Sequence, residues 1–200
     1  TIFLAGSYLV KVAVGEIIDN ETLGGAKTHC EISGVTDYIS KDDQSCISTI
    51  RDIIGKITTS EKLNYNKIES RKPILNIEDF YGTFPSQRST NYDVKEILKF
   101  FVDNGDFTEY KANYGKTIVC AYARIDGWSV GIVANQRKVV KNSKSEMQFG
   151  GVIYSDSANK ASRFIMNCNQ KKIPLVFFQD VSGFMVGSRS EHGGIIKDGA

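Results

Sequence analysis

Apolar residues recur with helical spacing shortly after a pair of acidic residues, Asp42 and Asp43. The apolar positions that follow are spaced by one, three and four residues, and they are Cys46, Ile47, Ile50, Ile53 and Ile54. This spacing is typical of one face of an amphipathic helix, and the two aspartates are candidate N-caps. The pattern predicts a helix that ends between Gly55 and Ile57.

Further along the chain, the pattern of apolar residues changes from one typical of a helix to one typical of β-strands. The stretch after Asp93, a candidate N-cap, predicts a helix that ends at an Asn104–Gly105 turn. Two runs rich in β-branched residues then follow, Thr117–Ile125 and Trp128–Ala134, and Asp126–Gly127 separates them. An Asp-Gly pair between two such runs is typical of a β-hairpin.

The last quarter of the chain predicts a helix followed by a strand. Ser155 or Asp156 is the expected cap of the helix, and its apolar face contains Ala158, Ala161, Ile165 and Cys168. The continuous apolar run Ile173–Phe178 is typical of a strand in a sheet that is covered on both faces. The residues from Gly193 onward resemble the opening of another helix. These patterns together predict an α/β chain.

The first part of the chain is less regular. Thr1–Val14 predicts a strand followed by a short helical stretch that closes at Gly15. Residues 17–40 are polar and broken by glycine, so they predict a loop with short extended pieces. The segment Thr58–Pro73 has almost no apolar periodicity and is typical of a linker.

Composition narrows the classes of partner and compartment. A formal net charge of +2 over 200 residues argues against nucleic acid or an anionic membrane as the main partner. No apolar run approaches the roughly 18 to 20 residues that a membrane span needs, and the start lacks a basic leader. The four cysteines are scattered, which predicts free thiols in a reducing compartment. The His29–Cys30 pair has no second cluster beside it, so no metal site is expected.

The glycines are the strongest candidates for a role in binding or catalysis. The Gly115–Thr117 stretch resembles the tail of a P-loop, but Tyr110 stands where that motif needs glycine. No hydrolase nucleophile elbow is present either. Bare backbone N–H groups can stabilise an oxyanion such as a thioester enolate, or the glycines can simply serve tight turns. The candidates are Gly24, Gly25, Gly34, Gly150, Gly151, Gly183, Gly187, Gly193 and Gly194.

Side chains near the last glycines leave two alternatives open. Phe184 and Met185 could line an apolar ligand pocket or belong to an ordinary core. Glu191 and His192 could form an acid–base pair, although surface contacts are the favoured interpretation. Spacing identifies no general base, so no catalytic side chain is assigned.

Several motifs nevertheless resemble a known family, the carboxyltransferase subunits of biotin-dependent acyl-CoA carboxylases. The similar stretches are "LAGSYLVKVAVGE", "LGGAKTHCEISGVTDY", the run from Tyr92 to Gln136, and "IPLVFFQDVSGFMVGSRSEHGGIIKDGA". "GFMVG", "LAG…LVK" and the "HC" at His29–Cys30 look most like the methylcrotonyl-CoA carboxylase branch. The propionyl-type branch usually has a proline-containing loop, where this chain has Ser182 and Val186.

The resemblance implies a crotonase-like fold built from ββα repeats, with parts of two such domains. Residues 1–59 would end the first domain, residues 60–91 would form a linker, and residues 92–200 would begin the second. The active site would lie between two subunits of a homo-oligomer. There CO2 would pass from carboxybiotin, carried by a biotin carboxylase or carrier partner, to an acyl-CoA. Biotin itself is thought to take the substrate proton, which agrees with the lack of a candidate base.

The resemblance also implies where the cofactor binds. The biotin-side pocket would include Gly183, Phe184, Met185, Gly187 and Gly194. The two oxyanion segments of the family would lie before Thr1 and after Ala200, so we expect a central piece that is inactive alone. The expected location is the cytoplasm, or the mitochondrial matrix in a eukaryote.

Two alternatives to this function remain: a subunit of a biotin-dependent acyl-CoA decarboxylase, or a non-catalytic assembly fragment. The segment Arg137–Phe149 is longer than in methylcrotonyl-type sequences. It could reach CoA phosphates, but a solvated loop is favoured.

Overall fold

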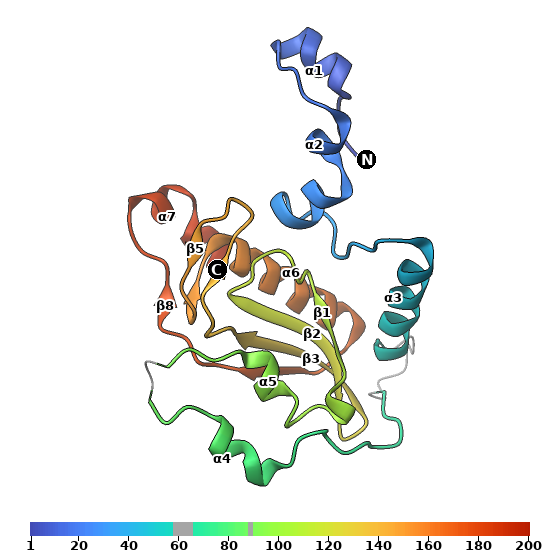
Figure 1. The fold of residues 1–200 in the computed structure, drawn as a ribbon, viewed down its shortest axis with the longest axis vertical. Coiled ribbons are helices and arrows are strands. Elements are labelled where there is room, and N and C mark those ends of the chain that lie inside the picture. Colours follow the sequence, from blue (N-terminus) through green and yellow to red (C-terminus); the bar gives the residue numbers. More distant parts are fainter. Residues whose placement is uncertain (58–65, 88–89) are drawn as a thin grey trace.

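A four-stranded sheet forms the centre of the computed structural model, which describes residues 1–57, 66–87 and 90–200 (Figure 1). Its strands are β1 (Phe107–Tyr110), β2 (Ile118–Ile125), β3 (Trp128–Asn135) and β7 (Leu175–Phe178), in the order β1-β2-β3-β7. The first three strands are antiparallel neighbours, whereas β7 runs parallel to β3. The predicted strand within Ile173–Phe178 is therefore confirmed.

The predicted β-hairpin between β2 and β3 is confirmed. Ile125 pairs with Trp128, which leaves a two-residue turn. Asp126 and Gly127 both have positive φ, 50° and 78°, as the hairpin turn favoured by Asp-Gly requires. The carboxylate of Asp103 accepts hydrogen bonds from the backbone N–H groups of both turn residues at 2.8 Å.

Helices cover both faces of the sheet, as predicted. α6 (Ser155–Lys171) packs Phe164 against Tyr122 of β2 and other residues of that face. On the opposite face, Leu98 of α5 (Val94–Leu98) packs with Val119 and Ile132. Because successive residues of β2 alternate between these two clusters, the strand is buried on both sides.

The helix predicted after Asp93 is shorter than expected, and the strand β1 was missed. Asp93 is the N-cap, and its side chain accepts a hydrogen bond from the Lys95 N–H. After α5 the chain continues in turns and a 3-10 segment, Asp103–Gly105, where Asn104 has a φ of 53°. The residues beyond this turn, for which no element was predicted, pair with β2 as an edge strand.

α6 begins where the sequence predicted, but its cap is different. The cap residue is Tyr154, not Ser155 or Asp156, and the hydroxyl of Ser157 bonds to both the N–H and the carbonyl of Tyr154. Of the predicted apolar face, Ala158 and Cys168 are buried.

Four small strands and two short helices complete the second part of the chain. They are β4 (Val140–Lys141), β5 (Met147–Gln148), β6 (Val152–Ile153), β8 (Gly183–Phe184), α7 (Ser188–His192) and α8 (Ile195–Gly199). β4 and β5 form a hairpin within Arg137–Phe149, so this segment is not simply a solvated loop. The helix expected after Gly193 is confirmed as α8.

Residues 1–57 form an arm that extends from the sheet (Figure 1). Its helices are α1 (Ser7–Val14), α2 (Asn20–Gly24), the π-helix η1 (Thr28–Ile32) and α3 (Asp43–Lys56). α3 confirms the amphipathic helix and its cap Asp42, which accepts a hydrogen bond from the Ser45 N–H.

Two predictions for the arm were wrong. No strand precedes α1 in the described part of the arm, although the helix itself closes at Gly15 as predicted. Within residues 17–40 the predicted loop holds for residues 33–40, but the short extended pieces were not found, and α2 and η1 form helical turns instead. The reason is local: Asp19 accepts a hydrogen bond from the Thr22 N–H and so caps α2.

Part of the predicted linker lies outside the described residues, namely residues 58–65 and 88–89. Between them, η2 (Ile77–Asp79) and α4 (Phe80–Thr83) run along the lower edge of the sheet domain in Figure 1. Phe80 of α4 contacts Phe100 edge-on, with 5.5 Å between ring centroids. In the described parts of the chain, no helix is both long enough and apolar enough to cross a membrane.

Candidate functional site

The glycine-rich segment after β7 adopts backbone conformations that side chains rarely permit. Gly183 in β8, Gly187 before α7 and Gly194 before α8 have φ values of 143°, 106° and 88°. Nothing lies within 4 Å of the position that a Cβ would take at any of the three. The conformation, rather than crowding, is therefore what requires glycine here.

Four of the five predicted pocket residues lie in one short run of the chain, and the fifth lies apart from this run. Gly183 and Phe184 form β8, which pairs with β6, and the N–H of Met185 donates to the carbonyl of Ile153 at 2.8 Å. Gly187 follows at the start of α7, whereas Gly194 lies beyond that helix.

Phe184 and Met185 have different surroundings. The ring of Phe184 lies against Gly199 of α8, where a Cβ would overlap it. Met185 lines a cavity of about 480 Å³ together with Val186, Met147 and Phe149. The sequence left open whether these two residues line a pocket or belong to an ordinary core. Met185 lines a pocket, whereas Phe184 packs on a helix.

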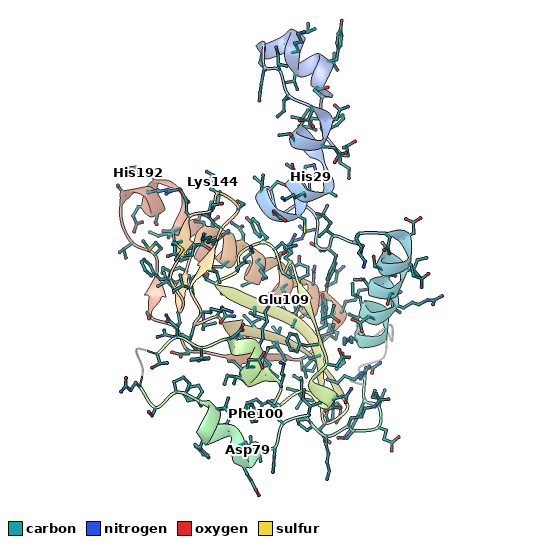
Figure 2. All side chains as sticks on the ribbon, viewed as in Figure 1. His29, Asp79, Phe100, Glu109, Lys144 and His192 are labelled. Atoms are coloured by element: carbon teal, nitrogen blue, oxygen red, sulfur yellow. The ribbon has the colours of Figure 1, made fainter. Side chains whose placement is uncertain are left out.

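The same cavity has a polar rim formed by the β4–β5 hairpin and α7. A nitrogen of the Arg189 guanidinium, Nη2, lies 2.9 and 3.0 Å from the two carboxylate oxygens of Glu146. Asn142 also donates to Glu146, at 2.8 Å, and these hydrogen bonds hold the pKa of Glu146 below its usual range. Figure 2 shows Lys144 at the tip of this hairpin.

A second group of polar side chains gathers where β3 and β7 end. Tyr92 donates a hydrogen bond to the Asp180 carboxylate at 2.8 Å, and Nε of Arg137 lies 3.5 Å from the same oxygen. Nη1 of Arg137 donates to Ser182 at 3.4 Å, and the N–H of Asp180 donates to Asn135 at 3.2 Å. Carboxyl ends of parallel strands are common ligand sites in α/β sheets.

The residues of this strand-end cluster surround a larger cavity. Arg137, Tyr92, Asp180 and Ser182 line a space of about 850 Å³, together with residues of the segment 84–87. Burial raises the pKa of Tyr92, and the hydrogen bond to Asp180 raises it further. The phenol therefore stays protonated as a donor, and Asp180 stays available as the partner of Arg137.

Gly150 and Gly151 have a role that the sequence did not reveal. A Cβ at Gly150 would overlap the carbonyl of Arg137, and one at Gly151 would overlap its guanidinium. The two glycines make room for Arg137, so their N–H groups are not required to explain them. Gly24 similarly makes room for the backbone of Ile2.

Sequence reasoning treated Arg137 only as the beginning of a long segment. The signal that could have found the cluster was the polar residues that directly follow each of two predicted strands. Without the knowledge that β3 and β7 are parallel neighbours, these residues could not be paired.

The remaining candidates do not join either cavity as catalytic groups. Glu191 and His192 are exposed on α7, and Figure 2 shows His192 at the outer end of that helix. His29 lies in the arm, where its ring bonds to Ser33 at 2.9 Å and to the carbonyl of Ile2 at 2.6 Å. Across residues 1–57, 66–87 and 90–200, no group of three His, Cys, Asp or Glu side chains is placed to hold a metal.

Comparison with known proteins gives the context of this arrangement. The chain is 40% identical over 200 residues to the methylcrotonoyl-CoA carboxylase beta chain of Dictyostelium discoideum, which covers 100% of this chain and 32% of that protein. It is 36% identical over 200 residues to the methylmalonyl-CoA decarboxylase subunit alpha of Propionigenium modestum, covering 99% and 37%. The chain thus spans about a third of the length of the curated relatives it matches.

The fold is shared with solved carboxyltransferases. The structure of transcarboxylase 12S, with methylmalonyl-coenzyme A and methylmalonic acid bound, aligns with a TM-score of 0.87 at 31% identity. The alignment covers 99% of this chain and 37% of that chain. The predicted crotonase-like fold is confirmed. Residues 1–200 match the Carboxyl transferase domain, and the chain therefore belongs to that family of biotin-dependent acyl-CoA carboxylases.

Proposed function

We propose that the full-length protein containing this chain transfers CO2 between a carboxybiotin and an acyl-CoA. The observation that carries the proposal is the strand-end cluster, in which Asp180 and Ser182 hold the Arg137 guanidinium at a cavity of about 850 Å³. A planar guanidinium can bind a carboxylate through two parallel hydrogen bonds. The transferred group of this family's reaction is such a carboxylate.

In this proposal the residues of the chain bind and orient rather than exchange protons. Tyr92 and Asp180 set the position of the Arg137 guanidinium, and Gly150 and Gly151 leave space for it. Arg137 then places the carboxylate, and correct placement is a large part of what such a site contributes. Carboxybiotin, carried by a partner protein, supplies the CO2.

We assign the biotin ring to the glycine-rich segment: Gly183, Phe184, Met185, Gly187 and Gly194. The fit is supported by the apolar wall that Met185 and Val186 give to the neighbouring cavity. It is also supported by the open space beside the three glycines, since nothing lies within 4 Å of the position that a Cβ would take at any of them. A bicyclic ligand with an apolar tail suits a wall of this kind.

The substrate is proposed to be a methylcrotonyl-type or propionyl-type acyl-CoA, and the subunit is proposed to form a homo-oligomer. A second candidate is the decarboxylase direction of the same transfer. It is favoured by the 36% identity to a methylmalonyl-CoA decarboxylase subunit. A panel of acyl-CoAs and their carboxylated products distinguishes the two, because only the decarboxylase releases CO2 without ATP-driven carboxylation of biotin.

The role of Arg137 is tested by substitution in the full-length subunit, assayed with its biotinylated partner. Arg137→Met should lower kcat/KM about 10- to 100-fold, which corresponds to the loss of one or two charge-assisted hydrogen bonds. Arg137→Lys should give an intermediate loss, because the charge remains without the bidentate geometry.

Lys138→Met is the matched control, since this neighbouring side chain is 64% exposed and pairs only at 3.7 Å with Asp93. Its kcat/KM should stay within about twofold of the wild type. Equal losses for Arg137→Met and Lys138→Met would contradict the assignment.

A further inference from the structure

A buried lysine joins the arm to the sheet. Lys111 directly follows β1 and is only 2% exposed, although its backbone has a φ of 48°. Its Nζ donates hydrogen bonds to the carbonyl oxygens of Gly34 and Thr36, the latter at 3.3 Å. It also forms an ion pair with Asp37 at 2.8 Å. These three oxygen partners match the three donors of an ammonium group.

Aromatic rings also contact the segment of the arm to which Lys111 binds. Residues 34–38, here called the joint segment, begin at Gly34, where a Cβ would lie 2.8 Å from the ring of Tyr114. They end at Tyr38, whose ring meets that of Tyr110 edge-on with 6.3 Å between centroids. The joint segment is therefore held between Lys111 and tyrosines of the sheet domain.

The joint segment also fixes the position of the residues that precede it in the sequence. η1 ends at Ile32, one residue before the joint segment begins, and its His29 bonds to Ser33 and to the carbonyl of Ile2. The N–H of Ile2 in turn donates to the carbonyl of Gly24 at 2.8 Å. The N–H of Thr36 donates to the carbonyl of His29 at 3.3 Å, so hydrogen bonds link Lys111 through Thr36 and His29 to the first residues of the arm.

Ile32 connects these hydrogen-bonded residues to the candidate site. Ile32 is the last residue of η1, and it lines the cavity of about 480 Å³ that Met185 and Met147 also line. Lys111 itself does not line that cavity. Its influence on the site must act through the joint segment and η1.

We propose that Lys111 is a positioning residue, whose ammonium group holds the joint segment and thereby places η1 against the candidate site. The kinetic part of this inference rests on the proposed carboxyltransferase function, whereas the structural part does not. Loss of the ammonium leaves one carboxylate and two carbonyl groups without their donor, and these groups would turn to water. The joint would then open while the sheet remains paired.

The test uses the full-length subunit and amide hydrogen exchange. In Lys111→Met, residues 24–38 should exchange at least about tenfold faster, while β2 and β3 exchange as in the wild type. Gly34→Ala should produce the same footprint, because it forces the segment away from Tyr114 while the side chain of Lys111 is kept. Lys171→Met, which removes an exposed lysine at the end of α6, is the matched charge control and should leave the exchange unchanged.

The kinetic readout separates positioning from general destabilisation. Lys111→Met should lower kcat about tenfold or more with KM for the acyl-CoA within about threefold, because groups are displaced but none that binds is removed. Asp37→Asn should have a smaller effect on kcat, since both carbonyl partners of Lys111 remain.

Two results would overturn the inference. One is unchanged exchange of residues 24–38 in Lys111→Met, and the other is an equal rise across β2 and β3, which would make Lys111 an ordinary core residue. If the wild-type subunit transfers no CO2, the proposed function fails. The exchange experiment would still decide whether Lys111 holds the joint.

Discussion

At the residue scale, burial determines which ionisable side chains can react. Cys120 of β2 is fully buried, and burial raises the pKa of its thiol to about 12. Cys46 of α3 is exposed, whereas Cys30 and Cys168 are buried like Cys120. All four are free thiols, as the sequence predicted. Cys46 is therefore the cysteine expected to react first with an alkylating reagent.

We expect the stability of the sheet to fall as the pH rises above about 9 because of Cys120. An unfolded thiol ionises near pH 8.5, but the folded thiol holds its proton to about pH 12. Between these values the folded state binds more protons than the unfolded state, so each rise in pH favours unfolding. The slope is at most about 1.4 kcal/mol per pH unit for this group.

Urea unfolding between pH 7.5 and 10.5, followed by the fluorescence of Trp128, measures this slope. Trp128 is the only tryptophan of the 200 residues and begins β3. Cys120→Ala should reduce the slope, whereas Cys46→Ala should preserve it. A slope that disappears only in Cys46→Ala would show that the buried thiol is not responsible.

At the element scale, the β2–β3 hairpin depends on one carboxylate. Asp103 is 6% exposed and accepts hydrogen bonds from the N–H groups of Asp126, Gly127 and Arg71. Both turn residues have left-handed backbone conformations, so the turn is held by these bonds and by its own geometry. The hairpin in turn carries the strand whose end bears Arg137.

We expect Asp103→Ala to lower the free energy of unfolding by about 3 kcal/mol, because three backbone donors lose a charged acceptor in a buried place. Urea unfolding with the Trp128 signal measures this change. Asp79→Ala is the matched control, since Asp79 is exposed beside α4 (Figure 2) and should change stability by less than about 0.5 kcal/mol. Equal effects of the two substitutions would contradict the role given to Asp103.

Elements with local signals were predictable from the sequence, and elements that depend on distant partners were not. α3, α6 and the hairpin each carry a cap or a turn pair in their own residues. β1 was missed because its four residues become a strand only by pairing with β2. Likewise Arg137 and Asp180 lie 43 positions apart in the sequence, and only the parallel pairing of β3 with β7 brings them together.

The resemblance to a known family predicted the fold class, which the described chain could not have established from periodicity alone. The biotin-side residues remain a prediction.

At the scale of the whole molecule, the sheet domain has a closed core and the arm does not. The apolar face of α3 is the clearest example, because Ile47, Ile50 and Ile54 are 46 to 55% exposed. α1 has no buried residue at all. Such surfaces are typical of contacts with further protein, and the chain spans about a third of its curated relatives. The arm contacts the sheet through polar groups, among them the Lys111 joint and the 3.1 Å ion pair between Lys56 and Asp106, and through Tyr38, which packs against the core of the sheet.

The central claim, CO2 transfer through biotin, is tested most directly by following an isotopic label in the reverse direction. The full-length subunit is mixed with an acyl-CoA carrying a ¹⁴C-labelled carboxylate, with and without the biotinylated partner. We predict that label appears on biotin and leaves the acyl-CoA only when the biotinylated partner is present. Loss of label from the acyl-CoA at the same rate without biotin, or no transfer at all, would contradict the account.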